Sequence, residues 1–171
     1  TELLVKKFSQ IEADATQPKW LAPLRKAGIA SFADQGFPTL KDEDWRFTNV
    51  APIAKLPFQL AGKAAVNGAE SMALEQAAFT KLDGHRLVFV NGFFCATLSE
   101  IKPLTGGARI ENLASTLAQD SAFIEKHLGK YAHTAGNAFA ALNQVFFTDG
   151  AFIFVPQGVE VAEPVIGPDA L

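Results

Sequence analysis

The sequence predicts an α+β fold, in which an N-terminal helical domain with one β-hairpin leads into a series of short strands. Apolar residues recur at helical spacing over 138–146, and an unbroken apolar run follows at 151–155. Asn91–Gly92, a pair that tolerates the positive φ angles of a two-residue turn, lies between two other apolar runs. Short strands separated by corners of a few residues are typical of the first coil of a β-solenoid or the edge of a sandwich.

The change of period falls at Asp149–Gly150 and divides two predicted domains. Residues 1–149 are expected to form an N-terminal helical cap domain with the β-hairpin near 86–98. Residues 150–171 are expected to supply the first strands of a β-rich core. Gly150 is predicted to close the preceding helix in the left-handed conformation, which costs glycine no steric strain.

The helix before this boundary and the strands after it have recognisable ends. Asn137 is a plausible N-cap, because its side chain can accept a hydrogen bond from a first-turn N–H. The expected apolar stripe of the helix comprises Ala138, Phe139, Leu142, Val145 and Phe146. Residues 151–155 read as a strand buried on both faces, which Pro156 ends by withholding a ladder donor. Gln157–Gly158 makes a corner, and Val165–Ile166 follows a second break.

Two further helices are predicted at the N-terminus, packed as an antiparallel pair. Thr16–Gln17 separates them, Pro18 suits the first turn of the second helix, and that helix should end near Gly36. The apolar stripe of the first helix comprises Leu4, Phe8, Ile11 and Ala15. That of the second comprises Leu21, Leu24, Gly28 and Phe32.

The loop GFPTLKDEDWRFTNV at 36–50 admits two interpretations. As a recognition loop, it would use its acidic residues for a cation and Trp45 and Arg46 for a ring or a phosphate. As a structural loop, it would use Trp45 and Phe47 as anchors to the helical pair, while Arg46 satisfies carbonyls or a neighbouring carboxylate. The structural interpretation is favoured, because a tryptophan beside a charge cluster is common in such loops.

The middle of the chain alternates between short strands and helices. The hairpin has the clearest strand signal, in HRLVFVNGFFCATL at 85–98. The other expected elements are a strand around Leu56–Leu60, a helix over Ser71–Leu82, a strand over Ala108–Ile110, a helix capped by Asn112, and a helix from Ser121 carrying Phe123, Ile124, Leu128 and Tyr131.

Local motifs for catalysis or metal binding are not found in the sequence. A zinc site from Cys95, His127 and His133 would require the fold to gather them, since the two histidines are six apart and do not share a helical face. Cys95 reads better as a small buried apolar residue. The 18 carboxylates are scattered, so no acid–base pair is nominated. We therefore assign no catalytic, cofactor-binding or metal-binding residue and expect a binding or scaffolding role, not an enzyme.

Composition excludes several classes of protein. Apolar residues make up 49% of the chain, so a packed core is expected. The net charge of −3 argues against a dominant nucleic-acid role, and no apolar run approaches the roughly 18 residues of a membrane span. The single cysteine fits a reducing compartment. These properties predict a soluble, cytoplasmic chain with neither nucleic-acid nor membrane partners.

Three stretches together resemble the N-terminal part of the SufD family, the accessory subunit of the SUF iron–sulfur cluster assembly complex. They are FPTLKDEDWRFTNV at 37–50, RLVFVNGFFCATLSEI at 86–101 and FAALNQVFFTDGAFIFVPQGVEVAEPV at 139–165. The resemblance implies an N-terminal helical domain, a right-handed parallel β-helix and a C-terminal segment that docks the SufC ATPase. The chain would then be truncated within the first coils, at Leu171.

The same resemblance implies partners, although it places none of the family's functional residues within this sequence. A SufB-like scaffold subunit and a SufC-like ATPase are the expected partners. A homodimer of the chain is a further option. The implied complex handles a nascent iron–sulfur cluster and ATP is bound by the ATPase, so this chain is expected to hold no cofactor.

Two other functions remain open from the sequence. The chain could belong to a SufB-like scaffold that holds the nascent cluster through ligands further along. The short N-terminal region and the direct passage from the hairpin into 137–165 favour the SufD-like assignment. A carbohydrate-active β-helix enzyme would need a secretion signal, which is not seen, and catalytic residues on later coils.

Overall fold

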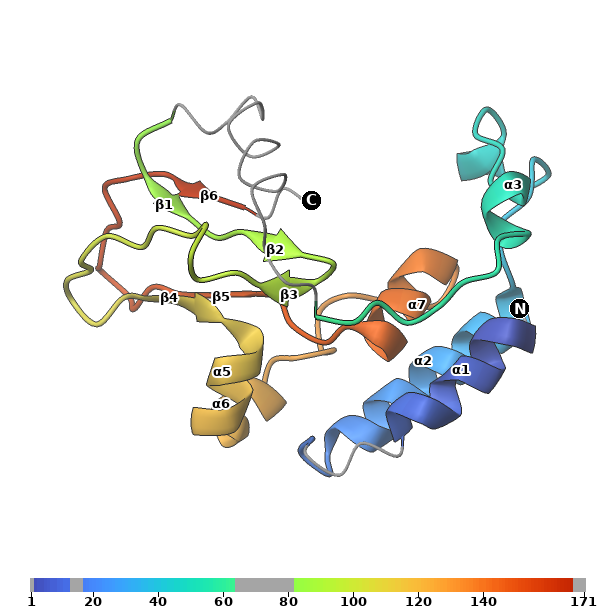
Figure 1. Cartoon of the computed structure of the whole chain (residues 1–171), viewed down its shortest axis with the longest axis horizontal. Helices are drawn as coiled ribbons and strands as arrows, with labels where there is room; N and C mark the ends of the chain where they lie inside the picture. The colour runs from blue at the N-terminus through green and yellow to red at the C-terminus, as the bar shows by residue number, and fades with distance from the viewer. Residues whose placement is uncertain (1, 13–16, 64–81, 168–171) are drawn as a thin grey trace. The chain divides into compact units, whose positions relative to one another are not determined.

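The computed structural model describes residues 2–12, 17–63 and 82–167, which fall into two compact units (Figure 1). The first unit comprises Thr1–Leu60 with Ser121–Phe147, and the second comprises Ala61–Asp120 with Thr148–Leu171. This grouping differs from the predicted domains, because the hairpin falls in the same unit as the strands after residue 148. Each unit is therefore built from two separate stretches of the chain.

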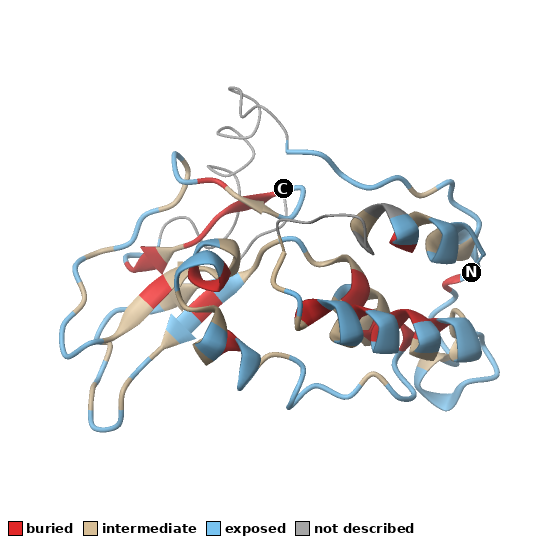
Figure 2. Cartoon of the chain, turned by 90° about the horizontal axis from the view of Figure 1, so that it is seen from below, coloured by how far each residue is buried: buried red, intermediate tan, exposed pale blue. Residues whose placement is uncertain are grey.

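Three helices form the core of the first unit. They are α1 (Glu2–Glu12), α2 (Leu21–Gln35) and α7 (Ala138–Phe146). Their buried apolar cluster comprises Phe8, Ile29, Phe32, Ala138, Ala141 and Val145. Figure 2 shows buried stretches along the helices. α2 packs mainly against α7 and less extensively against α1, so the predicted helical pair is two sides of a three-helix cluster. A Cβ at Gly28 would lie 3.0 Å from Val145 Cγ2 and 3.1 Å from the Ala141 carbonyl oxygen, so glycine permits this close helix approach.

The shorter elements of the first unit correct several expectations. They are η1 (Glu43–Trp45), α3 (Ala51–Ala54) and α6 (Ser121–Glu125). The strand expected around Leu56–Leu60 is wrong, because this segment is irregular, pairs with none of the described strands, and exposes both leucines. Pro18 lies in a turn before α2, since the Leu21 N–H donates to the Pro18 carbonyl. The helix from Ser121 is shorter than expected and does not reach Tyr131, which is 73% exposed.

Within its described residues, the second unit contains three two-stranded sheets and one helix. β1 (His85–Arg86) pairs in parallel with β6 (Val165–Ile166). β2 (Phe89–Val90) pairs antiparallel with β3 (Phe93–Phe94), and β4 (Arg109–Asn112) pairs antiparallel with β5 (Ala151–Phe154). The helix is α5 (Leu113–Gln119). Leu87, Phe89 and Ile110 form a buried cluster beneath these strands.

The predicted hairpin is confirmed. Asn91 has φ 53° and Gly92 has φ 81°, the two successive positive values that a type I′ turn requires. Cys95, directly after β3, is buried as expected. The helix expected over Ser71–Leu82 lies almost entirely outside the described residues.

β5 corrects the expectation of a strand buried on both faces. Phe152 is 9% exposed, but Ile153 is 49% and Val155 42% exposed. Exposure alternates along β5, with Phe152 buried between the exposed Ala151 and Ile153, so only one face of the strand is covered. The corner that follows is confirmed, because the Val159 N–H donates to the Pro156 carbonyl at 3.1 Å and Gly158 has φ 79°.

The end of α7 also differs from its prediction. Asn137 is the N-cap, as expected, and its side chain accepts the Ala140 N–H at 2.9 Å. At the other end the helix stops at Phe146, and Phe147 turns into an extended conformation with ψ 136°. Gly150 is not in the left-handed region, so it does not close the helix. Across the described ranges, the helices lack the length and apolar character that crossing a bilayer would require.

Candidate functional site

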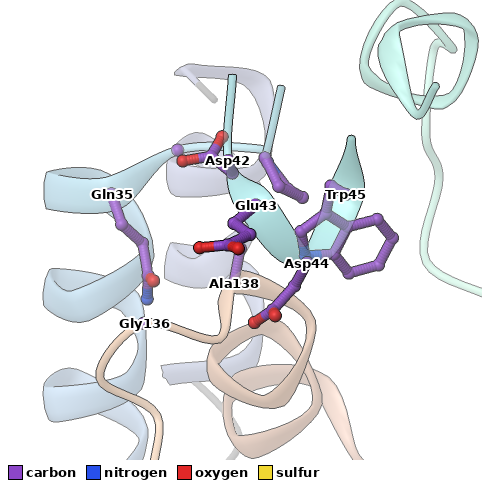
Figure 3. A pocket seen from close by; sticks show the side chains of 9 residues that line it. Gln35, Asp42, Glu43, Asp44, Trp45, Gly136 and Ala138 are labelled. Atoms are coloured by element: carbon purple, nitrogen blue, oxygen red, sulfur yellow. The ribbon is translucent and has the colours of Figure 1, made fainter. Parts of the chain in front are cut away.

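A depression of about 410 Å³ lies beside the loop that the sequence singled out. The segment Asp42–Trp45 forms one wall, and Gln35, Gly136 and Ala138 contribute to the others (Figure 3). These residues all belong to the first unit, at the end of α2 and the start of α7. The depression therefore gathers the acidic residues that the recognition hypothesis requires.

Asp42 determines how the chain enters this loop. Its Oδ2 accepts the backbone N–H of Thr39 at 2.6 Å and the Thr39 hydroxyl at 3.0 Å. These hydrogen bonds, the backbone one first, lower the pKa of the Asp42 carboxyl. Asp42 thus serves the fold of its own loop. Figure 3 shows the carboxylates of Glu43 and Asp44 on the other side of the turn from the Trp45 ring.

The aromatic residues of the loop differ in whether they pack against a helix. The Trp45 ring lies 5.2 Å from that of Phe139 on α7, and Phe37 lies 5.9 Å from the same ring, measured between centroids. Trp45 therefore anchors the loop, but the contact is with α7 and not with the predicted helical pair. The same role for Phe47 is wrong, because this side chain is 89% exposed. The Arg46 guanidinium lies over the Phe47 ring, 4.9 Å from its centroid, and does not line the depression.

The depression does not have the ligand set of a metal site. Within the described part of the chain, no three His, Cys, Asp or Glu side chains are placed so that they could hold a metal ion. Glu43 and Asp44 are exposed carboxylates on a short turn. The contacts of Trp45 and Asp42 show that the loop is held to α7 and to itself, which favours the structural interpretation.

Among the described residues, none of the three residues considered for zinc belongs to a group of side chains that could hold a metal ion. Cys95 belongs to the second unit, whereas His127 and His133 belong to the first. His127 Nδ1 lies 3.0 Å from the Tyr131 hydroxyl, and its ring lies 5.0 Å from that of Phe123. His133 is exposed. The histidines are therefore explained by local contacts or by solvent exposure.

Asp149, which sequence reasoning treated only as part of a helix stop, accepts four hydrogen bonds. Its Oδ1 accepts the backbone N–H groups of Ala114 and Gly150, both at 2.8 Å. Its Oδ2 accepts the Asn112 side-chain amide at 2.9 Å and the Phe94 N–H at 3.3 Å. Asn112 does occupy the N-cap position of α5, but its side chain makes no capping bond. Asp149 supplies that bond from a distant part of the chain.

Arg25 is a second residue that sequence reasoning missed. It is 3% exposed, and its two terminal nitrogens donate to the carbonyls of Val145 and Phe147. Its guanidinium also lies over the Phe147 ring, 4.4 Å from the centroid. Arg25 thus satisfies carbonyl groups at the C-terminal end of α7, where a cation is also favoured by the helix dipole. No local signal marks this role, because the partners are about 120 residues away.

Comparison with known proteins adds a family context to this geometry. Residues 2–166 match a family model described as the SufBD protein N-terminal region. An iron–sulfur cluster assembly SufBD family protein from Synechocystis sp. is 27% identical over 157 residues, which cover 91% of this chain and 34% of the relative. Another such protein of the same organism is 41% identical over 49 residues, covering 29% of this chain and 10% of that relative. The chain thus spans about a third of the length of the first relative.

Proposed function

This chain belongs to the SufBD family, and we propose from that membership that it serves iron–sulfur cluster assembly as the N-terminal part of a SufD-like accessory subunit. The observation that carries the proposal is the family match over residues 2–166, nearly the whole chain. The relatives named above are described as cluster assembly proteins. The proposed role is non-catalytic: the region folds as a cap and offers surface to partners.

The proposed partners are a SufB-like scaffold and a SufC-like ATPase. In this proposal the scaffold handles the nascent cluster and the ATPase binds ATP, so the chain itself holds no cofactor. The SufD-like assignment rests on the three resembling stretches. The chain does not pass directly from the hairpin to α7, because β4, α5 and α6 lie between these elements. This feature therefore does not favour the SufD-like assignment.

We also propose that the strands after residue 150 open a right-handed parallel β-helix. Ile153 on β5 and Val155 directly after it support this proposal, because they lie two residues apart and both are exposed apolar side chains. A further coil stacked on them would remove both side chains from water. A structure of the full-length protein tests it: strands that leave these side chains uncovered, or that continue as a sandwich, would overturn it.

Co-purification tests the partner proposal. The full-length protein is mixed at micromolar concentration with SufB-like and SufC-like partners, beside a form that lacks residues 2–166. We expect the full-length protein to associate with both partners. Association with neither partner would overturn the proposal. Unchanged association of the shortened form would place the contacts outside residues 2–166.

Anaerobic reconstitution separates the accessory role from the scaffold role. The full-length protein alone is incubated with iron and sulfide and its visible absorption spectrum is recorded. The accessory proposal expects no stable cluster spectrum in the absence of the scaffold partner. A stable cluster on the protein alone would instead assign the SufB-like scaffold role.

A further inference from the structure

A buried histidine in the second unit has no part in the function proposed above. His85 lies on β1, and its side chain is 0% exposed. An imidazole can exist as a neutral ring with one N–H or as a cation with two, so the hydrogen-bond partners of a buried imidazole decide whether a second proton can be accommodated.

β1 is the middle of three adjacent segments. On one side, the His85 N–H donates to the Pro164 carbonyl at 2.9 Å, beside the pairing with β6. On the other side, Arg86 and Glu100 exchange backbone hydrogen bonds of 2.6 and 2.8 Å. The backbone of β1 therefore joins the segment near residue 100 to the segment that contains β6.

The imidazole contacts both of these neighbours. Its Nδ1 accepts the backbone N–H of Lys102 at 3.2 Å. An acceptor nitrogen carries no proton, so the neutral ring has its proton on Nε2. Within the described residues, Nε2 has no hydrogen-bond partner, and the nearest acidic oxygen is Glu163 Oε2 at 3.9 Å.

A second proton would disrupt this arrangement. It would place an N–H on Nδ1 against the Lys102 N–H, so that two donors would face each other and the hydrogen bond would be lost. The charged ring would also be fully buried. Glu163 opposes these effects only weakly, because its side chain is 45% exposed and 3.9 Å away.

The other charged groups around β1 are already paired with one another. Lys102 Nζ lies 2.5 Å from Asp83 Oδ1, and this hydrogen bond lowers the pKa of Asp83 and raises that of Lys102. Arg86 Nη2 lies 3.4 Å from Glu100 Oε2. Among the described residues, Glu163 is thus the acidic group that faces the imidazole.

We propose that His85 is a proton-sensitive latch, which holds the Lys102 segment to β1 when the ring is neutral and releases it when the ring is protonated. The latch acts through the Nδ1 hydrogen bond to the Lys102 backbone, whereas the backbone pairing of β1 with β6 and with Glu100 remains. It gives this region a conformational response to acidification that does not depend on partners or cluster chemistry.

Amide hydrogen exchange of the intact protein, followed by NMR, tests the latch. As the pH is lowered stepwise from about 8 over the whole range in which the protein stays folded, the protection of the Lys102 amide should fall about tenfold relative to its intrinsic exchange rate when the ring takes up a second proton. The Cys95 amide, which donates to the Val88 carbonyl in the hairpin, should keep its protection. Unchanged protection at Lys102 would overturn the proposal.

Two variants and one spectrum complete the test. His85→Asn keeps an acceptor near the position of Nδ1 and does not titrate, so it should abolish the pH response at Lys102. His133→Asn, which changes an exposed histidine, should leave the response intact. Nitrogen chemical shifts of the wild-type ring should show the Nε2–H tautomer at about pH 8. An Nδ1–H tautomer, or an equal response in His85→Asn, would overturn the latch.

Discussion

Asp149 and Arg25 each satisfy backbone groups at the end of a helix that is distant in the sequence. Asp149 accepts the Ala114 N–H in the first turn of α5, and Arg25 donates to carbonyls at the end of α7. Each charge also has the sign that its helix end favours, an anion at the N-terminus and a cation at the C-terminus. Single side chains therefore determine how two helix ends are attached to their units.

Replacing Asp149 with alanine should destabilise the protein by about 2–4 kcal/mol, because four hydrogen-bond donors lose their acceptor. Asp149→Asn keeps one acceptor oxygen, so we expect an intermediate loss. Urea unfolding monitored by circular dichroism gives the free energy of unfolding for each variant.

Asp34, an exposed residue of α2, provides the control for this substitution. Asp34→Ala should change the free energy of unfolding by no more than about 0.5 kcal/mol. A loss for Asp149→Ala as small as that for Asp34→Ala would mean that water replaces the carboxylate without cost.

Glu111 should make stability depend on pH. Arg109 donates to both of its carboxylate oxygens, at 2.9 and 3.0 Å, and this pairing lowers the pKa of Glu111, with a further hydrogen bond from Thr116. The unfolded carboxyl titrates near pH 4.3, about the model-peptide value. The stabilisation is therefore present above that pH and is lost as the pH falls through the lower folded pKa.

Glu111→Gln removes this titration, so the difference in unfolding free energy between wild type and variant should shrink as the pH falls below about 4.3. Urea unfolding at a series of pH values measures the difference. Glu160→Gln, at an exposed position in the same unit, should run parallel to the wild type. A constant difference for Glu111→Gln would show that the pair with Arg109 adds no pH-dependent stability.

At the scale of elements, the strand and helix patterns differ in what they determine. The period of α7 and its N-cap follow from local residues, since Asn137 bonds to the Ala140 N–H within its own turn. The apolar run of β5 predicts a strand correctly but not its exposure. A continuous apolar run has no alternation, so it cannot show which face is covered or by what.

The hairpin turn offers a clean test of backbone conformation. A Cβ at Gly92 would meet only Thr148 Oγ1, at 3.8 Å, so space is not the constraint there. The constraint is φ 81°, which costs a residue with a side chain roughly 1–2 kcal/mol. Gly92→Ala should lower the free energy of unfolding by that amount, measured by urea unfolding.

Gly62 supplies the matched control, because its φ is not positive and nothing lies within 4 Å of an added Cβ. Gly62→Ala should be neutral or slightly stabilising, since alanine reduces the entropy of the unfolded chain. Equal effects of the two substitutions would mean that the turn is not held in the type I′ conformation in solution.

At the scale of the whole molecule, the chain passes between two compact units and returns. The first unit needs α7, which follows the hairpin by more than 40 residues, and the second needs β5 and β6 from the end of the described chain. The sequence instead predicts one domain at 1–149 followed by another. The two descriptions differ on where the hairpin and β4 find their partners.

A fragment of residues 1–149 distinguishes these descriptions. It retains all segments of the first unit but removes the partners of β1 and β4. Trp20 and Trp45 both lie in the first unit, so the fluorescence of the fragment should still report cooperative unfolding. Amide protection at 109–112 should be lost. Retained protection there would support the predicted domain of residues 1–149.

For the candidate site, the sequence correctly indicated a loop anchored by Trp45, because a large aromatic beside charged residues rarely stays in water. It failed for Phe47, which is two residues further along and is 89% exposed. It also overlooked Asp149, Arg25 and His85. These polar residues gain their roles from partners brought close only by the fold.

The sequence alone determined the features whose causes are local: the helix of 138–146 with its cap, the hairpin turn at Asn91–Gly92 and the corner at Gln157–Gly158. Its extended similarity to the SufBD family also carried the functional assignment. Only the tertiary structure decided which strands pair, which face of β5 is covered, and which side chains satisfy distant helix ends. The physical reason is that backbone conformation depends on neighbouring residues, whereas burial and long-range hydrogen bonding depend on residues that meet only after the chain has folded.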